Sequence, residues 1–267
     1  MSDEILFDLD QGIGLITFNR PDAMNTFTGA MVDGLGELYG RCDEDDEVKV
    51  VVVTGSGKAF CAGADLSGGG DTFQTGNNLD FSSCPLSVQA WDVRKPIIAA
   101  VNGHAIGVGL SIAAQCDIRV LAEEGKYGLL QNRRGVVADF AIGQVLPRLI
   151  GFERAFEMIV RAPRMSGTEA GEWGLASRVV PAVRVLDTAM EIARDMVTNC
   201  SPLVMGIHKR LMWRGHDMSR EEFIELETRL LHHTITAPDA VEGGMAYFER
   251  RPPQWKSRVT KDWPEDF

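Results

Sequence analysis

The hydrophobic and polar positions in the first half of the chain follow the pattern of β-strands. Residues 5–21 contain two β-rich runs separated by a Gln-Gly pair, which predicts a hairpin. Residues 48–55, VKVVVVTG, form a continuous β-branched run that ends at a glycine, as expected of a strand buried on both faces. Residues 96–103, PIIAAVNG, repeat this design, and residues 116–123 predict a further strand.

Helical spacing of apolar residues occurs between these predicted strands. Residues 28 to about 42 have this spacing, and so do residues 107–116, which begin at glycines. Strands that alternate with helices indicate an α/β fold. Residues 67–85 are instead rich in Gly, Ser and Asn without periodicity, and a loop of that length in a compact domain is usually functional or disordered.

After about Ser201 the pattern becomes helical throughout. Ser201 precedes a proline and fits an N-cap followed by Pro at the first helical position. Ser219 and Glu222 have the spacing of a capping box, and Pro238 fits the start of a last helix that runs to Arg250. The apolar positions of this segment need a surface to pack against, either in the chain or in another subunit: Phe223, Leu226, Leu230, Tyr247 and Phe248.

Composition and charge exclude several classes of function. The net charge of -11 argues against general binding to nucleic acid or to anionic membranes, because both require a basic field. No apolar run approaches the roughly 20 residues of a membrane span, and the acidic N-terminal residues do not resemble a secretory signal. The five cysteines are scattered and lack metal-ligand spacing, so we expect reduced thiols, no metal site and a cytoplasmic protein.

Two glycine-rich turns, at residues 55–57 and 102–109, follow predicted buried strands. Such turns can present backbone N–H groups to a ligand, because glycine permits positive φ and close approach. The first turn lacks the third glycine of a dinucleotide fingerprint, and its GSGK sequence lacks the four-residue gap of a P-loop. Either turn alone also fits an ordinary tight turn of an α/β domain.

Asp139 lies in an apolar run, with Arg133 and Arg134 just upstream. An isolated carboxylate in such company costs free energy unless it is paired, hydrogen-bonded or protonated. Burial should raise the pKa of Asp139, whereas a neighbouring arginine would lower it. A carboxyl tuned in this way can exchange protons with a substrate. The alternative interpretation is that Asp139 caps the following helix at its N-terminus, and both roles can coexist.

Six motifs occur in order along nearly the whole chain. They are NRPDAMNTF (19–27), AFCAGADL (59–66), KPIIAAVNGHAIGVG (95–109), CDIRVLAEEGKYG (116–128), LPRLIG (146–151) and DAVEGGMAYFERRPP (239–253). In this order they resemble the crotonase, or enoyl-CoA hydratase/isomerase, superfamily. The resemblance implies a crotonase-like spiral of ββα units over residues 1–200 and a C-terminal helical oligomerisation segment over residues 201–267. It also implies homotrimers, often paired into hexamers.

Members of this superfamily bind acyl-CoA thioesters and stabilise an enolate-like oxyanion with two backbone N–H groups. By resemblance, the donors here are the N–H groups of Ala64 and Val108; the family usually has glycine at the second position, and valine adds bulk beside the thioester. Preorganised donors of this kind can each contribute roughly 3–4 kcal/mol. No separate cofactor is implied, because CoA is part of the substrate.

The resemblance also assigns residues that contact the CoA portion of the substrate. Tyr247 and Arg250 match tail residues that contact the nucleotide, from the same or a neighbouring subunit, and Arg250 with Arg251 forms a basic pair suited to CoA phosphates. Those arginines also fit a solvated helix end. Near the first glycine turn, the CoA-contacting strip comprises Ala23, Met24, Ala62, Asp65 and Leu66.

At the two glutamate positions of typical hydratases this chain has Ser111 and Gln131, neither of which exchanges protons near neutral pH. A two-glutamate hydratase mechanism is therefore excluded. Asp139 matches the place where dienoyl-CoA isomerases have a catalytic aspartate, so we expect it to be the sole carboxylate acid/base. Ser111 lacks a His/Asp constellation and is not a nucleophile. Trp91 and Phe73 are candidates to line the acyl pocket.

Several functions remain open at this stage. Enoyl-CoA hydration is the usual activity of such relatives and is the first expectation, whereas one carboxylate better suits isomerisation of an enoyl- or dienoyl-CoA. Loss of both glutamates also fits a non-catalytic acyl-CoA-binding protein. A carbon–carbon hydrolase that acts on a diketone without CoA is a further alternative on the same scaffold.

Overall fold

The computed structural model describes residues 3–69, 82–265 and 267. Its larger sheet has the strand order β1-β2-β3-β5-β7-β10, and its smaller sheet has the order β4-β6-β8-β9. The larger sheet comprises β1 (Ile5–Asp10), β2 (Ile13–Phe18), β3 (Val50–Gly55), β5 (Ile97–Val101), β7 (Ile118–Ala122) and β10 (Arg178–Val180). The smaller sheet comprises β4 (Ala59–Cys61), β6 (His104–Ile106), β8 (Lys126–Gly128) and β9 (Met165–Ser166).

The described helices comprise core helices, C-terminal helices and shorter helical turns. The core helices are α1 (Gly29–Glu44), α2 (Val108–Gln115), α3 (Ile142–Ile150), α4 (Phe152–Phe156), α5 (Gly167–Glu172) and α6 (Val185–Asn199). The C-terminal helices are α7 (Pro202–Gly215), α8 (Arg220–Ile235) and α9 (Pro238–Glu249). Shorter helical turns are η1 (Pro21–Ala23), η3 (Gln131–Arg134), the π-helical η4 (Glu157–Arg161) and η5 (Ala182–Arg184). Within the described part of the chain, no helix combines the length and the apolar character that a membrane crossing needs.

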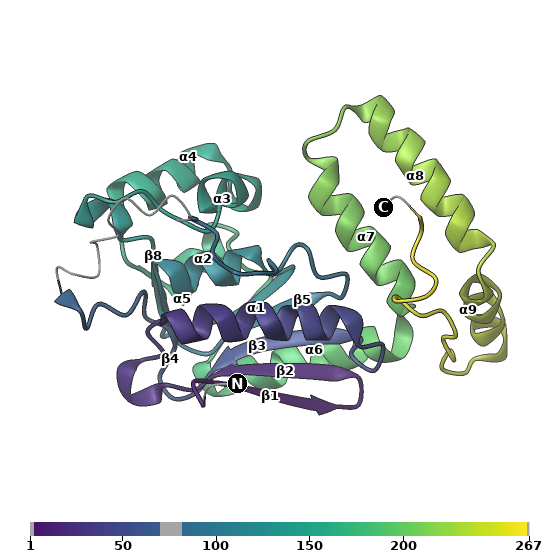
Figure 1. Cartoon of the computed structure of the whole chain (residues 1–267), viewed down its shortest axis with the longest axis horizontal. Helices are drawn as coiled ribbons and strands as arrows, with labels where there is room; N and C mark the ends of the chain where they lie inside the picture. The colour runs from purple at the N-terminus through teal and green to yellow at the C-terminus, as the bar shows by residue number, and fades with distance from the viewer. Residues whose placement is uncertain (1–2, 70–81, 266) are drawn as a thin grey trace.

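The larger sheet is covered on both faces, as the sequence predicts. Strands β1 and β2 form the expected antiparallel hairpin, and β2, β3, β5, β7 and β10 then run parallel. Along β3, Val51 and Val53 belong to the main apolar core, whereas Val50 and Val52 pack in the cluster against α6. Figure 1 shows α1 and α6 on opposite sides of this sheet. Because successive side chains of a strand point to opposite faces, a strand buried on both faces needs a continuous apolar run.

The core is a spiral in which successive turns share the same plan. A long strand of the larger sheet is followed by a short strand of the smaller sheet, as in β3–β4, β5–β6 and β7–β8, and the last two pairs lead into α2 and α3. The short strands β4, β6 and β8 pair in parallel with one another, so the turns of the spiral stack. This arrangement confirms the predicted α/β fold of ββα units.

The C-terminal helices begin at the residues that the sequence marks. The Ser201 hydroxyl accepts a hydrogen bond from the N–H of Val204 at the start of α7, and Ser219 with Glu222 forms the predicted capping box of α8. Leu226 and Leu230 pack with Phe223 in an apolar cluster between α7, α8 and the tail of the chain. The boundary at residue 200 and an oligomerising role for residues 201–267 stay predictions.

The contact between α2 and β4 provides a test of the stacking. A methyl group added at Gly109 would lie 2.2 Å from the carbonyl oxygen of Cys61. Because backbone atoms cannot move aside at low cost, we expect Gly109→Ala to lower the free energy of unfolding by about 1–3 kcal/mol. Gly143→Ala is the matched control: its added methyl group meets no atom within 4 Å, and we expect a gain of about 0.4–1 kcal/mol. Urea denaturation followed by circular dichroism measures the free energy of unfolding of each variant. Equal changes in the two variants would contradict the close contact at Gly109.

Candidate active site

Ala64 and Val108 follow two neighbouring parallel strands of the smaller sheet. Strand β4 ends at Cys61, which pairs with Ala105 of β6, so the loops that follow leave the same edge. Each candidate donor comes directly after a glycine with positive φ, Gly63 at 118° and Gly107 at 57°. Within the described residues, neither the N–H of Ala64 nor that of Val108 donates a hydrogen bond to the protein. Both groups are therefore available to a ligand oxygen.

The N–H of Val108 is the first of α2, where the helix leaves its amide donors without intrahelical acceptors. This end of the helix also has the positive end of the helix dipole, which favours negative charge. The Val108 side chain is buried and belongs to the main apolar core, so its bulk is packed within the protein.

The loop that contains Ala64 is fixed by hydrogen bonds to residues 24–27. The N–H of Ala62 donates to the carbonyl of Met24 at 3.0 Å. The N–H of Phe27 donates to Gly63 at 2.8 Å, and the N–H of Asp65 donates to Phe27 at 3.0 Å. These bonds bring the predicted CoA-contacting residues onto one ridge: Ala23, Met24, Ala62, Asp65 and Leu66.

Asn25 holds this ridge to the core, a role that sequence analysis did not assign. Its fully buried side chain donates to the carbonyls of Ser56 at 2.9 Å and Ala59 at 2.7 Å, and it accepts from the N–H of Arg20 at 2.7 Å. Arg20 also pairs with Asp65 at 2.9 Å. The second asparagine of the NRPDAMNTF motif was the sequence signal for this role. Asparagine tolerates left-handed backbone conformations, and Asn25 has a φ of 54°.

Asp139 lies between η3 and α3 and is partly buried. Its Oδ1 accepts a hydrogen bond from Nε2 of Gln131 at 3.3 Å. Burial raises the pKa of Asp139 above its ordinary value, and the bond from Gln131 opposes this effect. The expectation that Arg133 or Arg134 lowers this pKa is wrong, because neither pairs with Asp139 and Arg133 instead donates to the carbonyl of Arg161.

The interpretation of Asp139 as a helix cap is also wrong. Helix α3 has Ala141 as its N-cap residue, and no side chain caps it. Only the backbone carbonyl of Asp139 accepts from this helix, at 3.2 Å from the N–H of Ile142. The carboxyl group is therefore not used to satisfy the helix N-terminus.

Ser111 and Gln131 lie deep in the same region. Ser111 is in the first turn of α2, and Gln131 begins η3, where its amide lies 3.6 Å from the position that a Cβ on Gly107 would occupy. The structure thus brings Gln131 together with Asp139 and places it against the turn that precedes Val108.

Tyr247 and Arg250 lie elsewhere in the chain. Both are at the C-terminal end of α9, which Figure 1 shows at the opposite end of the molecule from β4. Tyr247 is 81% exposed. Arg250 and Arg251 do not form the expected pair of free positive charges, because Arg251 forms ion pairs with Glu242 and Glu249. Within one chain, α9 does not reach the ridge or the two N–H groups.

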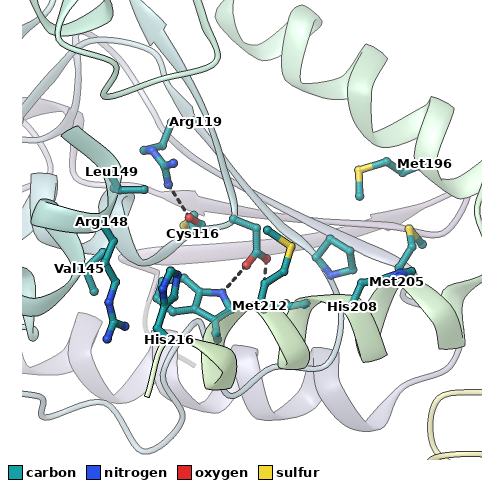
Figure 2. Close-up of a pocket in the computed structure, with 14 residues that line it drawn as sticks. Cys116, Arg119, Val145, Arg148, Leu149, Met196, Met205, His208, Met212 and His216 are labelled. Atoms are coloured by element: carbon teal, nitrogen blue, oxygen red, sulfur yellow. Dashed lines mark hydrogen bonds and ion pairs between the residues drawn. The ribbon is translucent and has the colours of Figure 1, made fainter. Parts of the chain in front are cut away.

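A cavity of about 460 Å³ lies at the junction of α3, α6 and α7 (Figure 2), and its lining residues include no member of the predicted site. Its apolar walls include Val145, Leu149, Met196, Met205 and Met212. Trp91 packs against Trp213 of α7, with ring centroids 5.9 Å apart, and its role in lining the acyl pocket stays a prediction. Phe73 lies outside the described residues.

The raised pKa of Asp139 predicts how stability depends on pH. Folding favours the protonated carboxyl, so part of the stability present below the unfolded-state pKa of about 3.9 is lost as the pH rises through the folded-state value. An amide avoids this loss. We expect Asp139→Asn to have a higher free energy of unfolding than the wild type at pH 7, with a difference that disappears on acidification. Denaturation at a series of pH values measures it; a variant destabilised at pH 7 would contradict the proposed environment.

Comparison with known proteins agrees with this geometry. The sequence model of the enoyl-CoA hydratase/isomerase family matches residues 8–258. The chain is 34% identical over 255 residues to a probable enoyl-CoA hydratase of Mycobacterium tuberculosis, covering 95% of this chain and 98% of that protein. It is 31% identical to the mitochondrial enoyl-CoA hydratase of Pongo abelii, covering 92% and 84%. A solved probable enoyl-CoA hydratase/isomerase from Mycobacterium abscessus superposes with a TM-score of 0.92 at 40% identity, covering 96% and 99%. The chain therefore belongs to the enoyl-CoA hydratase/isomerase family.

Proposed function

We propose that this protein is an enzyme that adds water to the double bond of a 2-enoyl-CoA thioester. The observation that supports this function best is the placement of two unused N–H groups, of Ala64 and Val108, at the ends of adjacent strands. Relatives that the chain matches over most of its length are named enoyl-CoA hydratases. Acyl-CoA is then the substrate, and the chemistry requires no separate cofactor.

In this mechanism the thioester oxygen accepts hydrogen bonds from the N–H groups of Ala64 and Val108. Ionised Asp139 takes a proton from water while the water oxygen bonds to the β-carbon, and the π electrons move onto the thioester oxygen as an enolate. The two donors stabilise that charge because they are fixed before it develops. Asp139 then returns its proton to the α-carbon, so one carboxyl group serves as base and as acid.

Isomerisation of an enoyl- or dienoyl-CoA is the second candidate. The specific observation in its favour is that Ser111 and Gln131 cannot exchange protons near neutral pH, which leaves Asp139 as the titratable group beside them. A single carboxyl can remove a proton from one carbon and deliver it to another through the same enolate. The product that forms distinguishes isomerisation from hydration.

We further propose that the CoA portion lies along the ridge formed by residues 23–24 and 62–66, and that Tyr247 and Arg250 of a second copy complete its nucleotide site. The exposure of Tyr247 and Phe248, at 81% and 79%, supports a contact with another subunit in a homotrimer or hexamer. Five free cysteines support the expectation of a reducing compartment such as the cytoplasm.

The catalytic proposal is tested by following crotonyl-CoA in D₂O by NMR. We expect wild-type protein to form 3-hydroxybutyryl-CoA labelled at the α-carbon, and Asp139→Asn to lose about 10²–10⁴-fold in rate. Asp217→Asn is the matched control, because Asp217 is an exposed carboxylate paired with Arg148 outside the site. A 3-enoyl product would favour isomerisation, whereas binding without any turnover or label would contradict both activities.

The role of Arg250 is tested by steady-state kinetics. Loss of a charged hydrogen bond to a phosphate should raise KM for the acyl-CoA about tenfold in Arg250→Ala and leave kcat unchanged. Arg229→Ala removes an exposed arginine from α8 and is the control. An unchanged KM in Arg250→Ala would exclude this contact while leaving the chemistry at Asp139 untouched.

A further inference from the structure

The two residues that follow Asp139 have an unusual backbone conformation. Phe140 has a φ of 55° and Ala141 has a φ of 53°, so both lie in the left-handed region. Residues with a side chain rarely adopt this region, because the Cβ atom comes too close to the following carbonyl oxygen. Two such residues in succession persist only where contacts with the surrounding structure hold them.

Hydrogen bonds from distant segments hold the peptide groups on both sides of Phe140. Nε2 of Gln115, the last residue of α2, donates to the carbonyl of Phe140 at 3.1 Å. The N–H of Phe140 donates to the carbonyl of Ser83 at 2.9 Å. The buried ring of Phe140 packs against the ring of Phe27, with centroids 6.5 Å apart. The left-handed conformation of Phe140 is therefore fixed from outside the turn.

Gln115 is itself held in place by a second buried glutamine. Its Nε2 also donates to Oε1 of Gln89 at 3.4 Å, and Nε2 of Gln89 donates to the carbonyls of Leu86 at 3.0 Å and Cys84 at 3.3 Å. Gln115 is 1% exposed. A buried amide costs free energy unless it is hydrogen-bonded, whereas an apolar side chain has no such cost. An amide at this position is therefore explained by the bonds that its N–H donors form.

We propose that Gln115 is a positioning residue for Asp139: by holding the carbonyl of Phe140, it fixes the left-handed turn that determines where the Asp139 carboxyl group lies. The inference rests on the proposed function, in which that carboxyl group transfers the proton. A turn that relaxed toward negative φ would change the direction of the chain directly after Asp139. The carboxyl group would then move from its place 3.3 Å from Nε2 of Gln131. Even a small misplacement of a catalytic group lowers the rate substantially.

The test is a double-mutant cycle between Gln115→Met and Asp139→Asn, measured by steady-state hydration of crotonyl-CoA. Methionine keeps the length of the glutamine side chain and removes its donor. We expect Gln115→Met to lower kcat about tenfold, as the loss of one hydrogen bond implies. KM should stay unchanged, because the ridge that binds CoA is untouched. Added to Asp139→Asn, the same change should lower kcat less than about twofold further, because no carboxyl group is left to position.

Ala141→Gly provides a rescue of the Gln115→Met variant. Glycine adopts the left-handed region without a clash, so the combined variant should regain at least about threefold in kcat. Gln89→Leu removes only a partner that holds Gln115 and is the milder second variant; it should lower kcat about threefold with KM unchanged. Tyr127→Phe is the matched control, because it removes a buried hydrogen bond to the carbonyl of Ala122, 2.9 Å long, outside the turn. This control should keep the wild-type kcat.

Three results would overturn the inference while hydration by Asp139 stands. They are a wild-type kcat in both glutamine variants, a loss that appears in KM instead of kcat, and a loss that multiplies in full with that of Asp139→Asn. Failure of Ala141→Gly to restore any of the lost rate would also overturn it, because the turn would then not be the cause of that loss. A wild-type protein that turns over no enoyl thioester overturns the proposed function and this inference together.

Discussion

The close packing of the α2 N-terminus on the end of β4 is the contact on which the site depends. Gly109 approaches the carbonyl of Cys61 so closely that no side chain fits between them, and Gly107 turns the chain through a positive φ just before Val108. The Ala64 loop leaves the neighbouring strand and is fixed by its bonds to residues 24–27. Backbone packing therefore sets the positions of both N–H groups, and a valine side chain at position 108 does not displace its own amide.

Asp139 forms no ion pair with any residue that the structure describes. Asp139 has a neutral amide as its hydrogen-bond partner, and the two arginines that precede it in sequence do not pair with it. A carboxyl in neutral, partly desolvated surroundings has a raised pKa, which favours uptake of a proton more than a fixed ion pair would. Ser111 and Gln131 are polar side chains that add no second group titrating near neutral pH.

The helical segment is attached to the core at a few strong points. Lys209 of α7 reaches Asp117 at 2.9 Å and the carbonyl of Ala90 at 2.7 Å, and Nε1 of Trp213 donates to the same carboxylate at 2.8 Å. The apolar cavity of Figure 2 lies beside these bonds. Farther along, α8 and α9 extend away from the spiral core, with Tyr247 and Phe248 facing solvent. The residues that attach the segment to the core are therefore on α7, whereas the exposed aromatic residues are on α9.

The sequence by itself determined the strands buried on both faces, the glycine turns, the helix caps and the family, because these follow from local periodicity and from the order of motifs along the chain. The strands of the smaller sheet, which are two or three residues long, were too short to give a periodic signal. Only the tertiary structure decided that Asp139 pairs with Gln131 rather than with arginine, and that Asn25 joins its own segment to the carbonyls of Ser56 and Ala59. Those contacts depend on how far-separated segments pack and on the direction of each side chain, which neighbouring residues in sequence do not specify.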